Sequence, residues 1–180
     1  MDTASVSQQR ARLPKREWLE VVQRAPLVSI DLIVTNTHGE VLLGWRSNQP
    51  AQHHWFVPGG VVRKGETLQQ AFERTVLDEL GVATRLNRLG VFDTVYEHHY
   101  AENFANEAGF GTHYVVLAHR VNVQALNAHG ETPEAIHDAG GLFNLDTLPK
   151  AQHTEYAWMA VPQLLVHKQV HPMTKAYFQA

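Results

Sequence analysis

The sequence predicts an α/β fold, in which a mixed β-sheet carries helices on its faces as an α/β sandwich. Three observations lead to this prediction. Short apolar segments rich in β-branched residues recur along the chain, which is typical of strands. Residues 67–80 have the 3.6-residue periodicity of an amphipathic helix, and Gly81 follows them as a stop. All these segments lie within 180 residues, which is the length of one domain.

The N-terminal part is expected to contain a tail, one helix and a β-hairpin. Residues 1–13 are polar and predict the tail. Pro14 suits a first helical turn, so we expect the helix over residues 14–25. Partly alternating and β-branched residues predict strands over residues 27–35 and 40–46, which a turn joins.

The central part is expected to contain a short strand and the amphipathic helix. The strand covers residues 55–57 and should end in a turn at residues 58–60, which contain one proline and two glycines. The apolar stripe of the helix consists of Leu68, Ala71, Phe72, Val76 and Leu80. Glu79 falls inside this stripe. Because an unpaired buried carboxylate is costly, an arginine, backbone donors or a cation must compensate it.

The C-terminal half is expected to contain three strands, one helix and two loops. The strands are predicted over residues 89–96, 112–121 and 156–160, and the helix over 161–167. Residues 98–111 are polar and predict a loop between the first two strands. Residues 122–150 contain three glycines and two prolines, so we expect an extended loop or insertion.

The composition excludes several classes of protein. Without cysteine, the chain forms no disulfide scaffold, no thiolate metal site and no thiol nucleophile. Its 15 basic and 18 acidic residues give a net charge of −3, which provides no basic field for a nucleic acid. No run approaches the roughly 18 apolar residues of a membrane span, and the opening stretch lacks the apolar core of a signal peptide. We therefore expect a cytoplasmic enzyme or binding module for a small molecule.

Residues 60–82, GVVRKGETLQQAFERTVLDELGV, resemble the box of the Nudix hydrolase superfamily. The positions that match its pattern are Gly60, Glu66, Arg74, Val76, Glu79, Gly81 and Val82. Two positions depart from it: Thr75 replaces the glutamate after the arginine, and Asp78 replaces the first of two paired glutamates. The resemblance implies a Nudix-type α/β/α sandwich with a mixed β-sheet, formed by residues 14–180 as a single domain.

A closer resemblance is to the GDP-mannose mannosyl hydrolase branch of this superfamily. It rests on the stretches PLVSIDLIV, VLLGWRSNQPAQ, WFVPGG, THYVVL, AQHTEY and AYF, and on the missing glutamate at Thr75. The branch has an arginine where this chain has Val61, although Arg63 lies close by. The resemblance implies hydrolysis of a GDP-hexose, GDP-mannose or GDP-glucose, to GDP and free sugar, with water attacking the anomeric carbon. It also implies a homodimer and a Mg²⁺ cofactor, for which Mn²⁺ can substitute.

The resemblance assigns roles to individual residues. It implies that the backbone carbonyl of Gly59 and the side chains of Glu79 and Gln152 bind Mg²⁺, and that His153 is the general base. The substrate-binding residues that it implies are Arg46 and Tyr114 at the diphosphate, Asp31 and His98 near the sugar, and Trp18 on the guanine. Trp18 could equally anchor the first helix, and Arg74 either binds substrate or braces the box carboxylates. Three further histidines, His53, His54 and His99, are expected to be loop residues.

Two other functions stay open at this point. A conventional Nudix pyrophosphatase would act on a nucleotide sugar or a nucleoside triphosphate, and Asp78 would then restore a metal ligand. A Nudix-fold module would bind a nucleotide without turnover. Carbon attack is chemically reasonable with fewer metal ions, because a Mg²⁺-bound diphosphate needs no carboxylic acid to protonate it on leaving.

Overall fold

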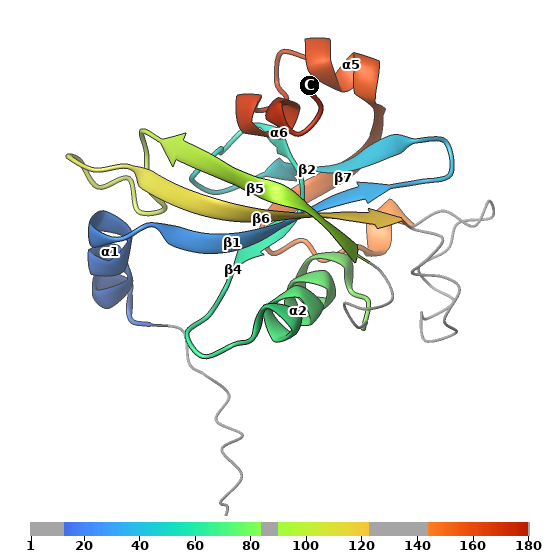
Figure 1. Cartoon of the computed structure of the whole chain (residues 1–180). Helices are drawn as coiled ribbons and strands as arrows, with labels where there is room; N and C mark the ends of the chain where they lie inside the picture. The colour runs from blue at the N-terminus through green and yellow to red at the C-terminus, as the bar shows by residue number, and fades with distance from the viewer. Residues whose placement is uncertain (1–12, 84–89, 123–143, 180) are drawn as a thin grey trace, which may run out of the picture.

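The computed structural model describes residues 13–83, 90–122 and 144–179. Helix α2 (Leu68–Leu80) lies beneath a central sheet, and α5 (Val161–Val166) and α6 (Pro172–Ala176) lie above it (Figure 1). Helix α1 (Lys15–Arg24) packs at one end of the sheet. The predicted α/β sandwich with a mixed sheet is therefore confirmed.

The sheet has seven strands in the described part of the chain. Their bounds are β1 (Leu27–Thr35), β2 (Glu40–Arg46), β3 (Trp55–Phe56), β4 (Gly59–Val61), β5 (Gly90–Tyr100), β6 (Thr112–Asn122) and β7 (His153–Ala160). The order is β3-β2-β1-β6-β5, with β4 paired to β1 and β7 paired to β2. Strands β1 and β6 run parallel in one uninterrupted register, and the other pairs are antiparallel.

Two hydrophobic clusters fill the two faces of the sheet. Alternation along β1 sends Ile30 and Leu32 to one side, where they pack with Phe72 of α2. Ile33 points to the other side and packs with Leu164 of α5. Each fully buried side chain of this size contributes roughly 1.5–3 kcal/mol to the free energy of unfolding. Both cores therefore hold the sheet rigidly between its helices.

Helix α2 begins and ends as its sequence predicts. Thr67 is the N-cap and forms a reciprocal capping box with Gln70, and Gly81 ends the helix in the left-handed region at a φ of 70°. Glu79 is buried together with the apolar stripe, as expected. Leu68 departs from this prediction, because it lies in the first turn and is 54% exposed.

Residues 58–60 do not form the predicted turn, because Gly59 and Gly60 begin strand β4. This strand pairs antiparallel with β1, so that Gly59 lies opposite Asp31. A Cβ atom at Gly59 would lie 2.6 Å from Asp31 Oδ1 and 2.7 Å from the carbonyl oxygen of Ile30. Glycine is required here for close approach of two backbones.

Two further strands and one helix also differ from the predictions. Strand β5 continues through His98 and His99 to Tyr100, because these residues pair with the start of β6. Strand β7 begins at His153 and not at residue 156, since His153 pairs with Arg46 across a bulge. Helix α6 has no counterpart among the predicted elements. These extensions depend on long-range pairing that the local sequence does not display.

The predicted tail and long loop lie mostly outside the described residues. Of the tail, only Leu13 is described, and it is exposed. Within residues 122–150, β6 extends to Asn122, and Leu145–Thr147 form a short 3-10 helix, η2. Within the same segment, residues 123–143 are not described.

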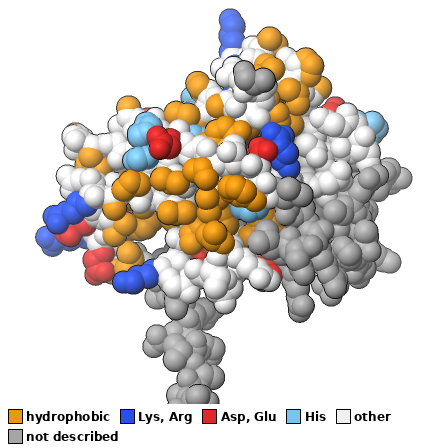
Figure 2. All heavy atoms as spheres, viewed as in Figure 1, with side chains coloured by type: hydrophobic (Ala, Val, Ile, Leu, Met, Phe, Trp, Pro, Cys, Tyr) orange, Lys and Arg blue, Asp and Glu red, His pale blue; other side chains and the backbone are white. Residues whose placement is uncertain are grey.

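Hydrophobic side chains gather over β1, β5 and β6 on the face shown in Figure 2. The large exposed hydrophobic residues that the structure describes in these strands are Val28, Phe92 and Val95. Among the described helices, none combines the length and apolar character needed to cross a membrane.

Candidate active site

A pocket of about 140 Å³ opens where β1, β2, β4, β5 and β6 converge. The residues predicted from the sequence that line it are Asp31, Arg46, Gly59, Gly60, His98, Tyr114 and Gln152. Residues from five strands and from the loop before β7 thus meet at one place. The mixed sheet brings them together because the register of β1 with β4 and with β6 fixes their relative positions.

Asp31 and His98 share a hydrogen-bonding partner in the wall of the pocket. The hydroxyl of Tyr177 donates to Asp31 Oδ2 at 2.6 Å and lies 3.3 Å from His98 Nε2. Burial raises the pKa of Asp31 to about 6, although the hydrogen bond from Tyr177 and the charge of Arg46 oppose the increase. Burial lowers the pKa of His98 to about 4, so this imidazole is neutral at pH 7. The pocket therefore holds one carboxyl group that titrates close to neutrality.

Arg46 supplies the positive charge of the pocket. Its guanidinium lies 3.4 Å from Gln152 Oε1 and 6.0 Å from the centre of the Phe56 ring. The Nε atom is buried and has no hydrogen-bonding partner among the described residues. Tyr114 also lines the pocket, and burial raises the pKa of its phenol to about 12, which keeps it a donor. A guanidinium and a phenol are both suited to the oxygen atoms of a diphosphate.

Glu79 lies beside the pocket, and its partners are an amide and an imidazole. Its side chain is 6% exposed, and Gln152 Nε2 donates to Oε1 at 2.6 Å. His153 Nδ1 lies 3.4 Å from Oε2. Among the described residues, no lysine or arginine forms an ion pair with Glu79. The charge of a buried carboxylate is thus left for another cation to balance.

The residues around Glu79 fit a hard divalent cation. The carboxylate of Glu79, the amide oxygen of Gln152 and the carbonyl of Gly59 are oxygen donors, which Mg²⁺ and Mn²⁺ prefer. The amide of Gln152 turns its nitrogen toward Glu79, so ligation by its oxygen requires the amide to rotate. Of these three residues, Gly59 and Gln152 line the pocket. A cation at this position would lie next to whatever the pocket binds.

Arg74 braces the acidic residues at the start of the box. Its Nε donates to Glu66 Oε1 at 2.7 Å, and its Nη2 donates to Glu66 Oε2 at 2.9 Å and to the carbonyl oxygen of Val61 at 2.8 Å. These hydrogen bonds are the main cause of the lowered pKa of Glu66. Asp78 lies 3.3 Å from Arg74 and 3.6 Å from Arg63, and its side chain is 46% exposed. Of the two predicted roles for Arg74, the contacts support bracing.

Trp18 and His153, like Glu79 and Arg74, do not line the pocket. Trp18 lies half-buried on α1, and its ring packs against Phe104 at 6.4 Å between centroids. His153 is completely buried. Its imidazole fills the space over Gly44, where a Cβ atom would collide with it. The role of His153 as a base therefore stays a prediction that the described geometry does not favour.

Sequence reasoning missed three aromatic residues of the site. Phe56 and Tyr100 line the pocket, and Tyr177 joins Asp31 to His98. Asp31 did give a signal, since an acidic residue in an apolar strand requires a partner. That partner is 146 positions away along the chain. Its identity could not be deduced from local sequence.

The fold and the site can be compared with known proteins. Residues 25–178 match the NUDIX domain family. The low-salt glycan biosynthesis protein Agl8 of Haloferax volcanii is 40% identical over 122 residues, which are 67% of this chain and 74% of that protein. A MutT NUDIX hydrolase from Burkholderia pseudomallei has a TM-score of 0.57 at 22% identity, over 85% of this chain and 95% of its own. The MutT protein from Methanosarcina mazei Go1 has a TM-score of 0.55 at 19% identity, over 86% and 92%.

Proposed function

The chain belongs to the NUDIX domain family, and on this basis we propose that it is a Mg²⁺-dependent hydrolase of a GDP-hexose, either GDP-mannose or GDP-glucose. Water attacks the anomeric carbon, and the products are GDP and free sugar. One observation carries the proposal: Glu79 is the single box carboxylate that lies buried without an arginine. Thr75 carries no charge, and Asp78 is paired with two arginines. This arrangement suits one cation on a leaving diphosphate better than several cations around an attacked phosphorus.

The size of the pocket supports binding of one part of such a substrate. Ligand pockets usually have volumes of roughly 300–1,000 Å³, and this one has about 140 Å³. We assign it to the junction between the sugar and the diphosphate. Arg46 and Tyr114 hold the phosphate oxygens, while Asp31 and His98 face the sugar. The name of the Haloferax relative refers to glycan biosynthesis, which supports a sugar-containing substrate.

The general base that the pocket supports best is Asp31. A base must come within hydrogen-bond reach of the water, and its pKa should be near the operating pH. Asp31 lines the pocket and has a pKa of about 6. His153 is completely buried and contacts Glu79, so we assign to it the positioning of that carboxylate. Tyr177 orients Asp31 through its hydrogen bond at 2.6 Å.

Mg²⁺ bound by Glu79 would neutralise the leaving diphosphate, which removes the need for a carboxylic acid at that position. Arg46 adds a fixed positive charge, and Tyr114 adds a phenol hydrogen bond. Asp31 takes a proton from the water as the bond to the anomeric carbon forms. The C–O bond to the diphosphate breaks in the same displacement, and GDP leaves with the electron pair.

Hydrolysis in ¹⁸O-labelled water tests the site of attack. We expect the label in the free sugar and none in GDP, as measured by mass spectrometry of both products. Label in GDP would show attack on phosphorus and would overturn the proposal. Release of GMP and a sugar phosphate would instead identify a pyrophosphatase. Absence of turnover with nucleotide sugars and nucleoside triphosphates, combined with measurable binding, would identify a nucleotide-binding module.

Two variants compared side by side test the base. General-base catalysis contributes about 10²–10⁴-fold to the rate, so the turnover of Asp31→Asn should fall by a factor within that range. The acid limb of the rate profile near pH 6 should disappear with it. His153→Gln should keep that acid limb, and its turnover should fall less than that of Asp31→Asn. The opposite outcome would return the role of base to His153.

We also propose that the protein is a homodimer. The exposed side chains of Val28, Phe92 and Val95 support this, because exposed apolar patches mark interaction surfaces. Light scattering on the full chain should give twice the monomer mass. Val95→Glu should lower that mass, while Val166→Glu, at an exposed position on α5, should leave it unchanged.

A further inference from the structure

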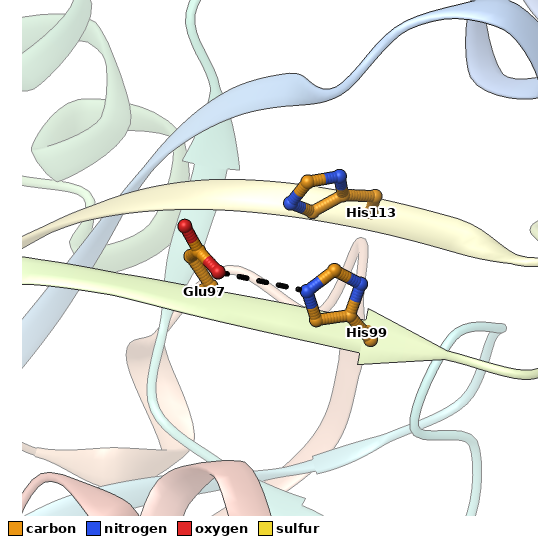
Figure 3. Close-up of side chains that lie close together, drawn as sticks. All are labelled: Glu97, His99 and His113. Atoms are coloured by element: carbon orange, nitrogen blue, oxygen red, sulfur yellow. Dashed lines mark ion pairs between the residues drawn. The ribbon is translucent and has the colours of Figure 1, made fainter.

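Three potential metal ligands lie together on strands β5 and β6, away from the pocket. Glu97 and His99 are two residues apart on β5, and His113 of β6 lies directly opposite His99. Because side chains alternate along a strand, all three project from the same face of the sheet. The intervening His98 projects from the opposite face and lines the pocket. Figure 3 shows the three side chains gathered at this place.

The contacts among these side chains leave one ring nitrogen, His113 Nε2, without a partner among the described residues. The rings of His99 and His113 are stacked, with centroids 4.1 Å apart and an angle of 26° between the planes. His99 Nε2 lies 3.8 Å from Glu97 Oε2 (Figure 3). His113 Nε2 is buried and has no hydrogen-bonding partner among the described residues. A buried ring nitrogen without a partner is unfavourable unless something binds it.

The spacing of the ligand atoms suits one small cation. One ligand atom from each residue lies within 4.8 Å of the other two. In a tetrahedral zinc site with bonds of 2.0–2.1 Å, neighbouring ligand atoms are about 3.3 Å apart. The remaining difference can be closed by side-chain rotation, because the side chains of Glu97 and His99 are 70% and 64% exposed. No backbone movement is required.

We infer that Glu97, His99 and His113 bind one transition-metal ion, with Zn²⁺ as the expected occupant. Imidazole nitrogen is a ligand for Zn²⁺, Ni²⁺ and Cu²⁺, whereas Mg²⁺ is bound through oxygen. The site is therefore chemically distinct from the cation site at Glu79 and does not depend on the proposed reaction. Bound Zn²⁺ joins β5 to β6 near the end of the sheet. Three protein ligands leave a fourth position open to water or to another donor.

Calorimetric titration of the full chain with ZnCl₂, in an excess of MgCl₂, tests this site. The magnesium occupies oxygen sites such as Glu79 and leaves the nitrogen ligands free. We expect one saturable zinc site per chain. His99→Ala and His113→Ala should each weaken it at least about tenfold, since even changes to groups behind a ligand cost that much. Glu97→Gln should weaken it less, because an amide oxygen keeps a neutral donor.

His38→Ala is the matched control, because His38 is an exposed histidine in the turn between β1 and β2. It should leave the zinc affinity unchanged. The electron paramagnetic resonance spectrum of bound Cu²⁺ gives a second measurement, with nitrogen couplings that the two histidine variants reduce. Circular dichroism establishes that each variant is folded. Equal zinc affinity in the wild type, His99→Ala and His113→Ala would overturn the inference, as would a Cu²⁺ spectrum without nitrogen couplings.

Discussion

Two pairs of carboxylates near the active site differ in what balances their charge. Glu66 and Asp78, at the outer side of the box, are held by arginines at 2.7–3.6 Å. Asp31 and Glu79, at the pocket, have as their closest partners a tyrosine hydroxyl and an amide, each at 2.6 Å. The outer pair is thus neutralised within the fold, while the inner pair keeps charge available for a cation or a proton. The four predictions below test this division.

The largest effect is expected at Glu79. Glu79→Gln keeps the shape of the side chain and removes its charge, so the cation should be lost. A metal ion supplies several kcal/mol of stabilisation to a developing negative charge, so turnover should fall on the order of 10³-fold. GDP release at increasing Mg²⁺ measures the effect.

The control for Glu79 is its neighbour Asp78. Asp78→Asn removes an exposed ion pair, which contributes at most about 1 kcal/mol, so turnover should change by about fivefold or less. Similar losses in the two variants would show that the outer and inner carboxylates are equivalent. Full activity of Glu79→Gln at limiting Mg²⁺ would show that Glu79 does not bind the cation.

Arg74 tests the outer pair through stability. Arg74→Ala removes the donors that Arg74 supplies to Glu66 and to the carbonyl of Val61 in a half-buried position, while Glu66 keeps the hydrogen bond from the backbone N–H of Arg63. We expect the free energy of unfolding to fall by about 2–3 kcal/mol in urea titrations. Arg63→Ala removes one exposed contact at 3.6 Å, and the expected loss is at most about 1 kcal/mol. Equal losses would mean that Arg74 has no special bracing role.

Asp31 tests the inner pair through the pH dependence of stability. Burial raises its pKa from 3.8 to about 6, so the folded state retains a proton in that window which the unfolded state has released. The stability that this proton provides is fully present below the pKa of Asp31 in the unfolded chain, and it is lost as the pH rises through the folded pKa of about 6. Asp31→Asn lacks this dependence. The free energy of unfolding of the variant, relative to that of the wild type, should rise by about 2 kcal/mol from about pH 4.5 to about pH 7.5.

Chemical denaturation of both proteins at the two pH values measures this difference. Subtracting one unfolding free energy from the other cancels the contributions of titrating groups that the two proteins share. A constant difference between them would mean that Asp31 has an ordinary pKa. A difference of opposite sign would place a cation next to the carboxylate in the folded protein.

The smallest effect is expected at Tyr177. The hydrogen bond from its hydroxyl stabilises ionised Asp31, so Tyr177→Phe should raise the pKa of Asp31 further and move the acid limb of the rate profile upward. A net hydrogen bond of about 1 kcal/mol changes the proton affinity of Asp31 roughly fivefold, so turnover should fall roughly fivefold on the acid limb and less than about twofold at pH 7. Tyr96→Phe, on strand β5, is the control. An unmoved acid limb in Tyr177→Phe would separate Tyr177 from the titrating group.

The local sequence was sufficient for the elements whose pattern is complete within a few residues. Strands β1 and β2 have the predicted bounds, because apolar residues predominate in them and a turn separates them. Helix α2 carries its own cap, stripe and stop. The buried position of Glu79 was predicted from the same periodicity. In each case the information lies inside the element.

The parts that could not be predicted depend on partners far along the chain. Gly59 belongs to a strand because β1 lies against it, and β5 continues past residue 96 because β6 pairs with it. The burial of His153 depends on the missing side chain of Gly44. Tyr177 reaches Asp31 only in the folded chain. Motif resemblance named residues that the structure brings together around one pocket, whereas the access of each residue to that pocket required the structure.

The topology of the sheet also sets when the site can form during synthesis. Strand β1 pairs with β2 only where Thr35 meets Val41, and its long register is with β6. Strand β2 pairs mainly with β7, and Tyr177, the hydrogen-bonding partner of Asp31, is synthesised after β7. A nascent chain must therefore carry its first two strands with open edges until most of it has left the ribosome. Such edges are prone to pair with other chains, so the N-terminal strands are exposed to incorrect pairing until β6 and β7 have been synthesised.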